Sequence, residues 1–154
     1  MSETIPRFLN AGDSALVVEF GTVVEPSIHD RVLSLDAALA ANCPTGVREA
    51  VPTYRSLMIH YDPLVLSRCA LISHVRKLAS SPAPITRPVQ RWTIPCCYDA
   101  EFGEDLSRIA ESTDLTSAEV VSLHSAASYR VYMYGFAPGF CYLGGLPSAL
   151  AISR

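Results

Sequence analysis

The order of the apolar segments in the first 94 residues constrains the fold more than any other feature of the sequence. Runs that alternate apolar and polar residues indicate strands, and apolar residues three or four positions apart indicate helices. Turn residues separate these segments. The pattern predicts a strand at 14–20, a helix from Pro26 to the turn at 42–46, strands at 47–51 and 55–61, a helix over 68–78 with Ser67 as its N-cap, and a strand at 89–94.

This strand–helix–strand–strand–helix–strand order is typical of the ferredoxin-like, or split βαβ, arrangement. In that arrangement both helices lie on one face of an antiparallel sheet. The order therefore predicts an α+β fold in which residues 1–86 form a ferredoxin-like domain.

Residues 87–154 follow a different pattern. Helical periodicity covers 104–112, a capping box at Thr116 and Glu119 begins a helix that ends near 125, and 128–136 alternates like a strand. About two strands are too few to bury a core by themselves. We therefore expect the start of a second domain, truncated at its C-terminal end, in a natural chain that continues past Arg154.

Charge and composition exclude several classes of function. The net charge is −3 and basic residues are spread along the chain, so no basic stripe is available to nucleic acid. The only lysine is Lys77, and no P-loop motif is present. The five cysteines lack zinc-ligand spacing, which predicts no metal site. With no signal segment and no run of 18 apolar residues, we expect a cytoplasmic chain without a membrane span.

Aromatic, glycine and proline residues gather near the end of the chain. Residues 129–142 hold six of the 13 aromatic residues (seven Tyr, five Phe and one Trp), and 135–147 holds four glycines and two prolines. Glycine lets another backbone or a ligand approach closely, and proline fixes the chain between the glycines. The segment is suited to a ligand-binding floor or a docking surface, and a tight β-turn over an aromatic core has the same composition.

The same segment resembles the signature of a known family. Residues 135–147 match Gly-Phe-x-Pro-Gly-Phe-x-Tyr-Leu-Gly-Gly-Leu at every specified position. That signature is typical of the family of 5-oxoprolinase B subunits, also called allophanate hydrolase subunit 1 or kinase-inhibitor-like, which is related to carboxyltransferase subdomains C and D. Further segments resemble the family in the same order, at 12–16, 49–57, 61–63, 94–103 and 124–133.

The resemblance implies a cyclophilin-like β-barrel that begins in 87–154, and ATP-dependent ring opening of 5-oxo-L-proline to L-glutamate. It also implies that the chain is active only with partners. These are the 5-oxoprolinase A subunit and the 5-oxoprolinase C subunit, which is the homologue of allophanate hydrolase subunit 2. ATP, with Mg²⁺, would bind on this chain or on a partner. Two alternatives share the signature: an inhibitor of a sensor histidine kinase, and one half of a urea-carboxylase-like carboxyltransferase.

Several side chains near the signature are candidates for chemistry. His124 is a candidate general acid or base because imidazole titrates near neutral pH, although a histidine at a helix end also caps carbonyls. Arg130 is suited to clamping a carboxylate or phosphate, or is simply solvated. Tyr132 and Tyr134 share a strand face with Arg130 as a polar aromatic wall, or pack in the core. The predicted substrate- or partner-binding residues, with loop amides suited to an oxyanion, are Arg130, Tyr132, Tyr134, Gly135, Phe136, Pro138, Gly139, Phe140, Tyr142, Gly144 and Gly145.

Overall fold

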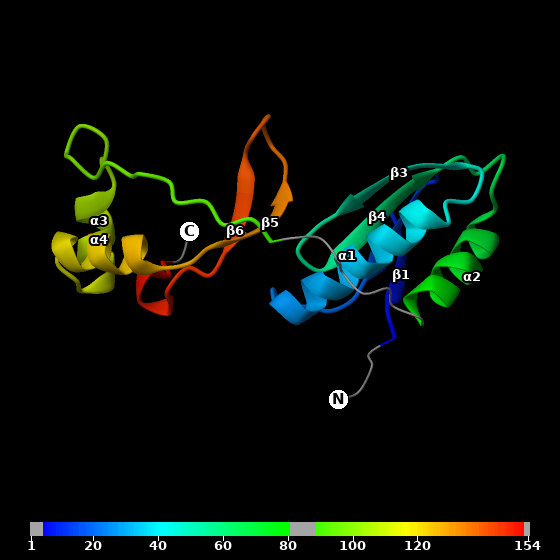
Figure 1. Cartoon of the computed structure of the whole chain (residues 1–154), viewed down its shortest axis with the longest axis horizontal. Helices are drawn as coiled ribbons and strands as arrows, with labels where there is room; N and C mark the ends of the chain where they lie inside the picture. Colours follow the sequence, from blue (N-terminus) through cyan, green and yellow to red (C-terminus); the bar gives the residue numbers. More distant parts are fainter. Residues whose placement is uncertain (1–4, 81–88, 153–154) are drawn as a thin grey trace. The chain divides into compact units, whose positions relative to one another are not determined.

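The computed structural model describes residues 5–80 and 89–152, and the chain divides into two compact units, 1–87 and 88–154. None of the described helices is both long and apolar enough to cross a membrane. The N-terminal unit contains β1 (Arg7–Asn10), β2 (Ala15–Glu19), α1 (Pro26–Ala41), β3 (Val47–Pro52), β4 (Ser56–Tyr61) and α2 (Arg68–Ala79), and the C-terminal unit contains α3 (Leu106–Thr113), α4 (Ser117–Ala126), β5 (Arg130–Tyr134), β6 (Cys141–Gly144) and the short 3₁₀ helix η1 (Ser148–Leu150) (Figure 1).

The N-terminal unit is a four-stranded antiparallel sheet with two helices on one face. The strand order is β1-β2-β4-β3, so β2 and β4 lie in the centre. Figure 1 shows α1 and α2 side by side over the sheet, and both helices contribute to one apolar core. The mixed α/β character and the antiparallel sheet predicted from the sequence are therefore confirmed for this unit.

The core of this unit lies between the apolar face of the sheet and the apolar sides of the two helices. On β4, Leu57, Ile59 and Tyr61 are buried while the residues between them are half-buried, as a strand with one face on a core requires. On α1, Val32 and Leu39 are at most 2% exposed and lie seven positions apart, on one side of the helix. Strands and helices were thus placed correctly by periodicity at these segments.

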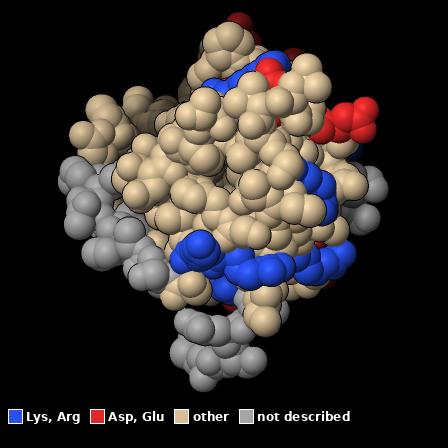
Figure 2. All heavy atoms as spheres, turned by 90° about the vertical axis from the view of Figure 1, so that its right-hand side faces the viewer, with Lys and Arg blue, Asp and Glu red and all other residues tan. Residues whose placement is uncertain are grey.

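Helix α2 begins at the predicted N-cap. The Ser67 side chain accepts a hydrogen bond from the amide of Ala70 at 3.3 Å, which satisfies one of the first free amides of the helix. Its apolar residues Leu71 and Val75 are fully buried. The exposed side of α2 carries three basic and no acidic residues, and Figure 2, which faces this end of the unit, shows a band of Lys and Arg low on this face and Asp and Glu at its upper right.

The prediction of a strand at 89–94 is wrong. Residues 89–98 have no regular secondary structure, and Val89, Trp92 and Ile94 are 97%, 77% and 79% exposed. A strand needs a neighbouring edge, and the edge beside β2 is taken by β1, which the sequence analysis did not predict. The described residues of the N-terminal unit therefore run strand–strand–helix–strand–strand–helix, which differs from the predicted ferredoxin-like order.

The C-terminal unit is built from two short helices and one hairpin. The predicted capping box is present, because Thr116 accepts from the Glu119 amide at 3.3 Å and the Glu119 carboxylate accepts from the Thr116 amide at 2.8 Å. Among residues 89–152 the buried cluster consists of Ala110, Val120 and Leu150, with half-buried leucine and isoleucine side chains packed against it. Strand β6 was not predicted, and within 89–152 β5 and β6 form a two-stranded sheet, so a cyclophilin-like barrel stays a prediction.

Candidate functional site

The eleven predicted binding residues lie together on one β-hairpin formed by β5 and β6, with Gly145 immediately after it. The loop between the strands is closed by its own amides. The Gly135 amide donates to the Phe140 carbonyl at 3.2 Å, and the Phe140 amide donates to the Ala137 carbonyl at 3.0 Å. Gly139 has a φ of +77°, in the left-handed region that favours glycine. These residues therefore form a tight turn with several of its amides already engaged.

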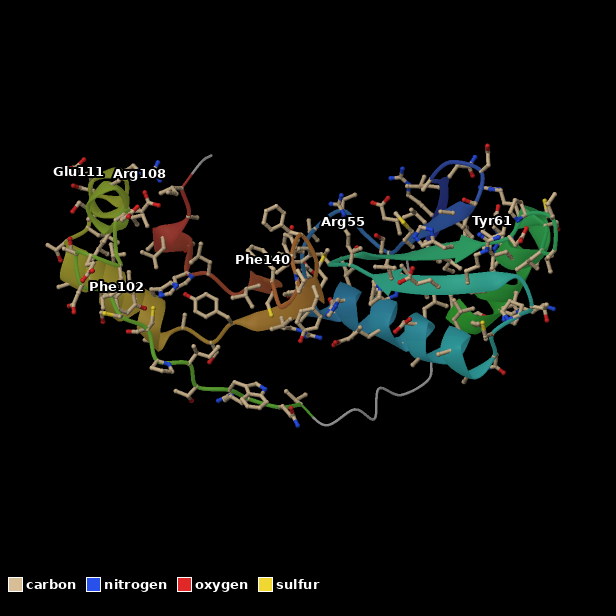
Figure 3. All side chains as sticks on the ribbon, turned by 90° about the horizontal axis from the view of Figure 1, so that it is seen from above. Arg55, Tyr61, Phe102, Arg108, Glu111 and Phe140 are labelled. Carbon is tan, nitrogen blue, oxygen red and sulfur yellow. The ribbon has the colours of Figure 1, made fainter. Side chains whose placement is uncertain are left out.

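An exposed row of aromatic rings runs along this hairpin. We call Tyr134, Phe136, Phe140 and Tyr142 the aromatic ridge. Phe136 is 90% exposed, Tyr134 is 69% exposed and Phe140 is 47% exposed. The ring of Phe140 packs edge-on against Phe136 at 5.4 Å and against Tyr142 at 5.3 Å between centroids, and Figure 3 shows Phe140 on the hairpin. Pre-packed aromatic rings left in solvent are typical of a surface that a partner covers.

The tip of the ridge holds an unusual backbone conformation. Phe136 has a φ of +66°, a left-handed conformation that is a genuine outlier for a bulky side chain. Such conformations cost about 1–3 kcal/mol and occur most often at binding and catalytic sites. The side chain is not held in place by burial, so its exposure and its strain together mark the tip as a contact position rather than a packing position.

The inner part of the hairpin is tightly packed. Tyr132 is 6% exposed, and a β-bulge lies at this residue, between Val131 and Met133. A Cβ atom on Gly144 would lie 2.5 Å from Cε2 of Tyr132, so only glycine fits opposite this ring. The guanidinium carbon of Arg130 lies 5.5 Å from the Tyr132 ring centroid. Tyr132 and Arg130 thus pack within the hairpin, whereas Tyr134 is exposed to solvent.

The last predicted residue, His124, lies at the end of α4 in a separate cluster. The hydroxyl oxygen of Tyr98 is 2.6 Å from Nδ1 of His124, and the two rings meet edge-on. The Tyr129 hydroxyl donates to the His124 carbonyl at 3.1 Å, and its ring lies 5.4 Å from the imidazole. We call Tyr98, His124 and Tyr129 the Tyr–His cluster. In this cluster Tyr129 binds a carbonyl at the end of α4, and Tyr98 holds Nδ1 of the imidazole.

The chemistry of the cluster is set by partial burial. Removal of water raises the pKa of the Tyr98 phenol, and its interaction with the Cys96 side chain raises it further. Burial alone raises the pKa of Tyr129. Both phenols therefore keep their protons at neutral pH. Nε2 of His124 makes no hydrogen bond within residues 5–80 and 89–152, so it is available to a reacting group.

Sequence reasoning did not select Tyr98 or Tyr129 as site residues. Tyr98 lies 26 positions before His124, and nothing in the periodicity of 89–98 indicates that its hydroxyl reaches α4. The resemblance of 94–103 to the family was the one signal that the segment had a role. Across the described ranges no three His, Cys, Asp or Glu side chains gather closely enough to hold a metal ion.

Comparison with known proteins places this chain in a family. Residues 6–154 match the family described as carboxyltransferase domain, subdomain C and D. The 5-oxoprolinase B subunit of Bacillus subtilis (strain 168) is 31% identical over 159 residues, which cover 93% of this chain and 64% of that protein. This chain therefore spans just under two thirds of the length of that relative.

Solved structures agree with this match. The crystal structure of TTHA0988 superposes with a TM-score of 0.73 at 37% identity, covering 91% of this chain and 27% of that one. The urea carboxylase of Kluyveromyces lactis has a TM-score of 0.64 at 18% identity, covering 84% of this chain and 14% of that one, and so shares the fold alone. The family match over residues 6–154 and these similarities show that the chain belongs to the family of carboxyltransferase subdomains C and D.

Proposed function

We propose that this chain acts as the B subunit of an ATP-dependent 5-oxoprolinase that hydrolyses 5-oxo-L-proline to L-glutamate. The observation that carries the proposal is its 31% identity, along 93% of its length, to a protein named as that subunit of 5-oxoprolinase. Such a subunit works within a complex, so the activity is assigned to the assembly and not to this chain alone. We expect the chain to be cytoplasmic.

The aromatic ridge is the proposed contact with a partner. Phe136 is 90% exposed and Tyr134 is 69% exposed, while the ring of Phe140 is already packed against the rings of Phe136 and Tyr142. A rigid, pre-packed surface loses little conformational entropy on binding. The proposed partner at this surface is the 5-oxoprolinase C subunit, the homologue of allophanate hydrolase subunit 2, and the 5-oxoprolinase A subunit completes the enzyme.

His124 is the proposed proton-transfer residue of this chain. Its Nδ1 is fixed by Tyr98 at 2.6 Å, while its Nε2 makes no hydrogen bond within the described residues. An imidazole held by one nitrogen presents the other in a defined direction, which general acid–base catalysis requires. Hydrolysis of a lactam needs a proton acceptor for water and a donor for the departing amine, and one imidazole serves both in succession.

Two features of the described residues are unsuited to a nucleoside triphosphate. The amides of Gly135 and Phe140 donate to carbonyls within the turn and so do not form an open phosphate cradle. A hollow of about 470 Å³ beside α3 and α4 is bordered by Glu111, Asp114 and Glu119, whose negative charges repel phosphate. We therefore propose that a partner supplies the binding site for ATP and Mg²⁺.

Two finer fold assignments are part of the same proposal. We propose that the two helices with β2, β3 and β4 are a ferredoxin-like body to which β1 is added at the edge. The β5–β6 hairpin is proposed to be the first part of a cyclophilin-like barrel. Its supporting observation is the pair of strand edges left unpaired within 89–152.

The decisive experiment is reconstitution. The full-length chain is combined with candidate A and C subunits, and glutamate release from 5-oxo-L-proline is measured with and without ATP. The proposal expects release that requires all three proteins and ATP. A complex that assembles and binds ATP but releases no glutamate would contradict it.

A second candidate function is one half of a carboxyltransferase. The observation in its favour is the fold shared with Kluyveromyces lactis urea carboxylase at a TM-score of 0.64. In that case the assembled complex would transfer a carboxyl group from carboxybiotin to an amide instead of opening a lactam. Transfer of labelled carboxyl groups, measured on the same reconstituted complex, separates the two functions.

A further inference from the structure

Strand β1 leaves one edge of the N-terminal sheet open among the described residues. It is the first strand in the order β1-β2-β4-β3, and within residues 5–80 and 89–152 no strand pairs with its outer side. Such an edge presents backbone amides and carbonyls with which another extended chain can pair. The N-terminal unit therefore offers a template for one more strand.

The ladder between β1 and β2 shows which backbone groups face outward. The Ala11 amide donates to the Ala15 carbonyl at 3.1 Å, in register with the β1–β2 pairs. Hydrogen-bonded and non-hydrogen-bonded pairs alternate along an antiparallel ladder. Leu9, two positions before Ala11, therefore bonds to β2, whereas the amides and carbonyls of Phe8 and Asn10 point to the open edge.

Two arginines of α2 are held beside these same residues. Nε of Arg68 donates to the side-chain oxygen of Asn10 at 2.7 Å, and the guanidinium carbon of Arg76 lies 5.4 Å from the Phe8 ring centroid. Both arginines are exposed, and neither forms an ion pair within the described residues. Helix α2 carries no acidic residue, and Figure 2, which faces this end of the unit, shows the band of Lys and Arg. Positive charge is thus held in place along the open edge.

We propose that the edge of β1 and the basic side of α2 form a docking site for an extended acidic segment of a partner protein. The segment adds to the sheet as a further antiparallel strand, paired with the backbone of Phe8 and Asn10. Cross-strand partners have their side chains on the same face of a sheet. The residues opposite Phe8 and Asn10 therefore lie on the α2 face, where their carboxylates meet Arg76 and Arg68.

The geometry of the sheet defines the pattern that such a segment must have. Phe8 and Asn10 are two positions apart, so the two acidic residues of the segment are also two positions apart. The residue between them lies on the other face, beside Leu9, whose side chain is 37% exposed. The expected pattern is acidic–apolar–acidic, because two adjacent acidic residues would place only one carboxylate near the arginines.

Binding of synthetic peptides to the full 154-residue chain tests the proposal, and it needs no enzyme activity, so the result does not depend on the proposed function. The probe is a fluorescein-labelled peptide, Ser-Thr-Glu-Val-Glu-Thr-Ser. The matched control, Ser-Thr-Val-Glu-Glu-Thr-Ser, has the same composition and charge. Fluorescence anisotropy at low salt should show that the probe binds at least about tenfold more tightly than the control. Equal affinities, or no binding of the probe, would overturn the proposal.

Charge-reversal variants separate this site from a general attraction to positive charge. Arg76→Glu should weaken binding of the probe at least about tenfold. Arg108→Glu makes the same change of charge at an exposed arginine of α3 and should leave the affinity unchanged. Equal losses in the two variants, or no loss in Arg76→Glu, would contradict the site.

A charge swap provides the rescue. The double variant Arg68→Glu/Arg76→Glu should lose the probe and bind Ser-Thr-Lys-Val-Lys-Thr-Ser, because the signs on both sides are exchanged while the open edge of β1 stays the same. Thermal denaturation establishes that the double variant is folded. A folded double variant that binds neither peptide, or that still binds the probe as the wild type does, would overturn the proposal.

Hydrogen exchange of single amides, measured by NMR, tests the added strand itself. Saturating probe should protect the amides of Phe8 and Asn10, which point to the open edge, and should change the Leu9 amide little, because it already bonds to β2. Unchanged exchange at Phe8 and Asn10 would overturn strand addition. A short single-stranded oligonucleotide that displaces the probe and binds more tightly would assign the surface to nucleic acid and would also overturn the proposal.

Discussion

The two units of this chain distribute their apolar residues in opposite ways. In the N-terminal unit, eleven described residues form one buried cluster, from both central strands and both helices. In the described part of the C-terminal unit the buried cluster has three members, while the rings of Phe136 and Tyr134 lie in solvent. Burial of apolar surface is the main stabilising term in folding. The difference therefore separates a unit with an apolar core of its own from a hairpin that presents a surface.

The largest expected effect comes from removing the same side chain from each core. Leu57 is fully buried in β4 and Leu150 is 6% exposed in η1. Leu57→Ala should lower the free energy of unfolding of its unit by about 2–5 kcal/mol, because the surrounding sheet and helices cannot collapse into the cavity. Leu150→Ala should cost less, since its small cluster relaxes more easily. Hydrogen exchange resolved by unit measures both, and equal losses would remove the distinction between the two cores.

A smaller effect is expected at two glycines of the hairpin. A Cβ atom on Gly145 would lie 2.7 Å from the Ser128 carbonyl oxygen, whereas a Cβ on Gly139 meets no atom within 4 Å. Both have positive φ. Gly139→Ala should therefore cost only the backbone strain of about 1–2 kcal/mol, and Gly145→Ala should cost more. Thermal denaturation of the two variants tests the order, and a greater loss at Gly139 would contradict it.

The aromatic ridge is expected to matter for association more than for stability. Phe136→Gly removes an exposed ring and relieves a left-handed backbone, so stability should stay unchanged or rise by roughly 1 kcal/mol. Affinity for the C subunit should fall at least about tenfold, as for an aromatic residue central to an interface. Calorimetric titration with that partner measures the affinity, and exposed Val24 in the N-terminal unit, changed to Ser, is the control. Equal affinities would show that the ridge is not the contact.

The smallest effect concerns one acidic group in each unit. Hydrogen bonds lower the pKa of Asp62, chiefly from Arg48 at 2.8 Å, and lower that of Glu119, chiefly from Thr116. A carboxyl group whose folded pKa is lowered stabilises the fold above its unfolded value, and this contribution is lost as pH falls through the folded pKa. Asp62→Asn and Glu119→Gln should flatten the acid limb of thermal stability below 3.8 and 4.5 respectively. Acid limbs as steep as in the wild type would show that these carboxyl groups do not contribute.

Local sequence patterns predicted a helix or strand correctly where the pattern arises from the element itself, through one buried face or through bonds between neighbouring residues. Leu57, Ile59 and Tyr61 alternate because one face of β4 lies on the core, and the Thr116–Glu119 box begins α4 through bonds between neighbours in sequence. The strand at 89–94 failed because alternation does not reveal whether a partner edge is free. Here β1 holds the edge beside β2.

The candidate site was predicted in part, for the same reason. The hairpin residues are contiguous, so their composition and their resemblance to a family signature indicated them directly. The pairing of Tyr98 with His124 spans 26 positions and depends on how 89–98 meets α4, which no local pattern contains. The bulge at Tyr132 likewise gave this ring and Tyr134 different environments, although simple alternation placed them on one face.

The central claim is that a stable body carries a hairpin made for a partner, and hydrogen exchange measured by mass spectrometry tests it directly. The full chain is compared alone and with the C subunit. We expect β2 and β4 to be strongly protected in both states, and residues 130–144 to be less protected than β2 and β4 in the free chain and to gain protection in the complex. Fast exchange of the hairpin in a complex that is assembled and active would contradict the central claim.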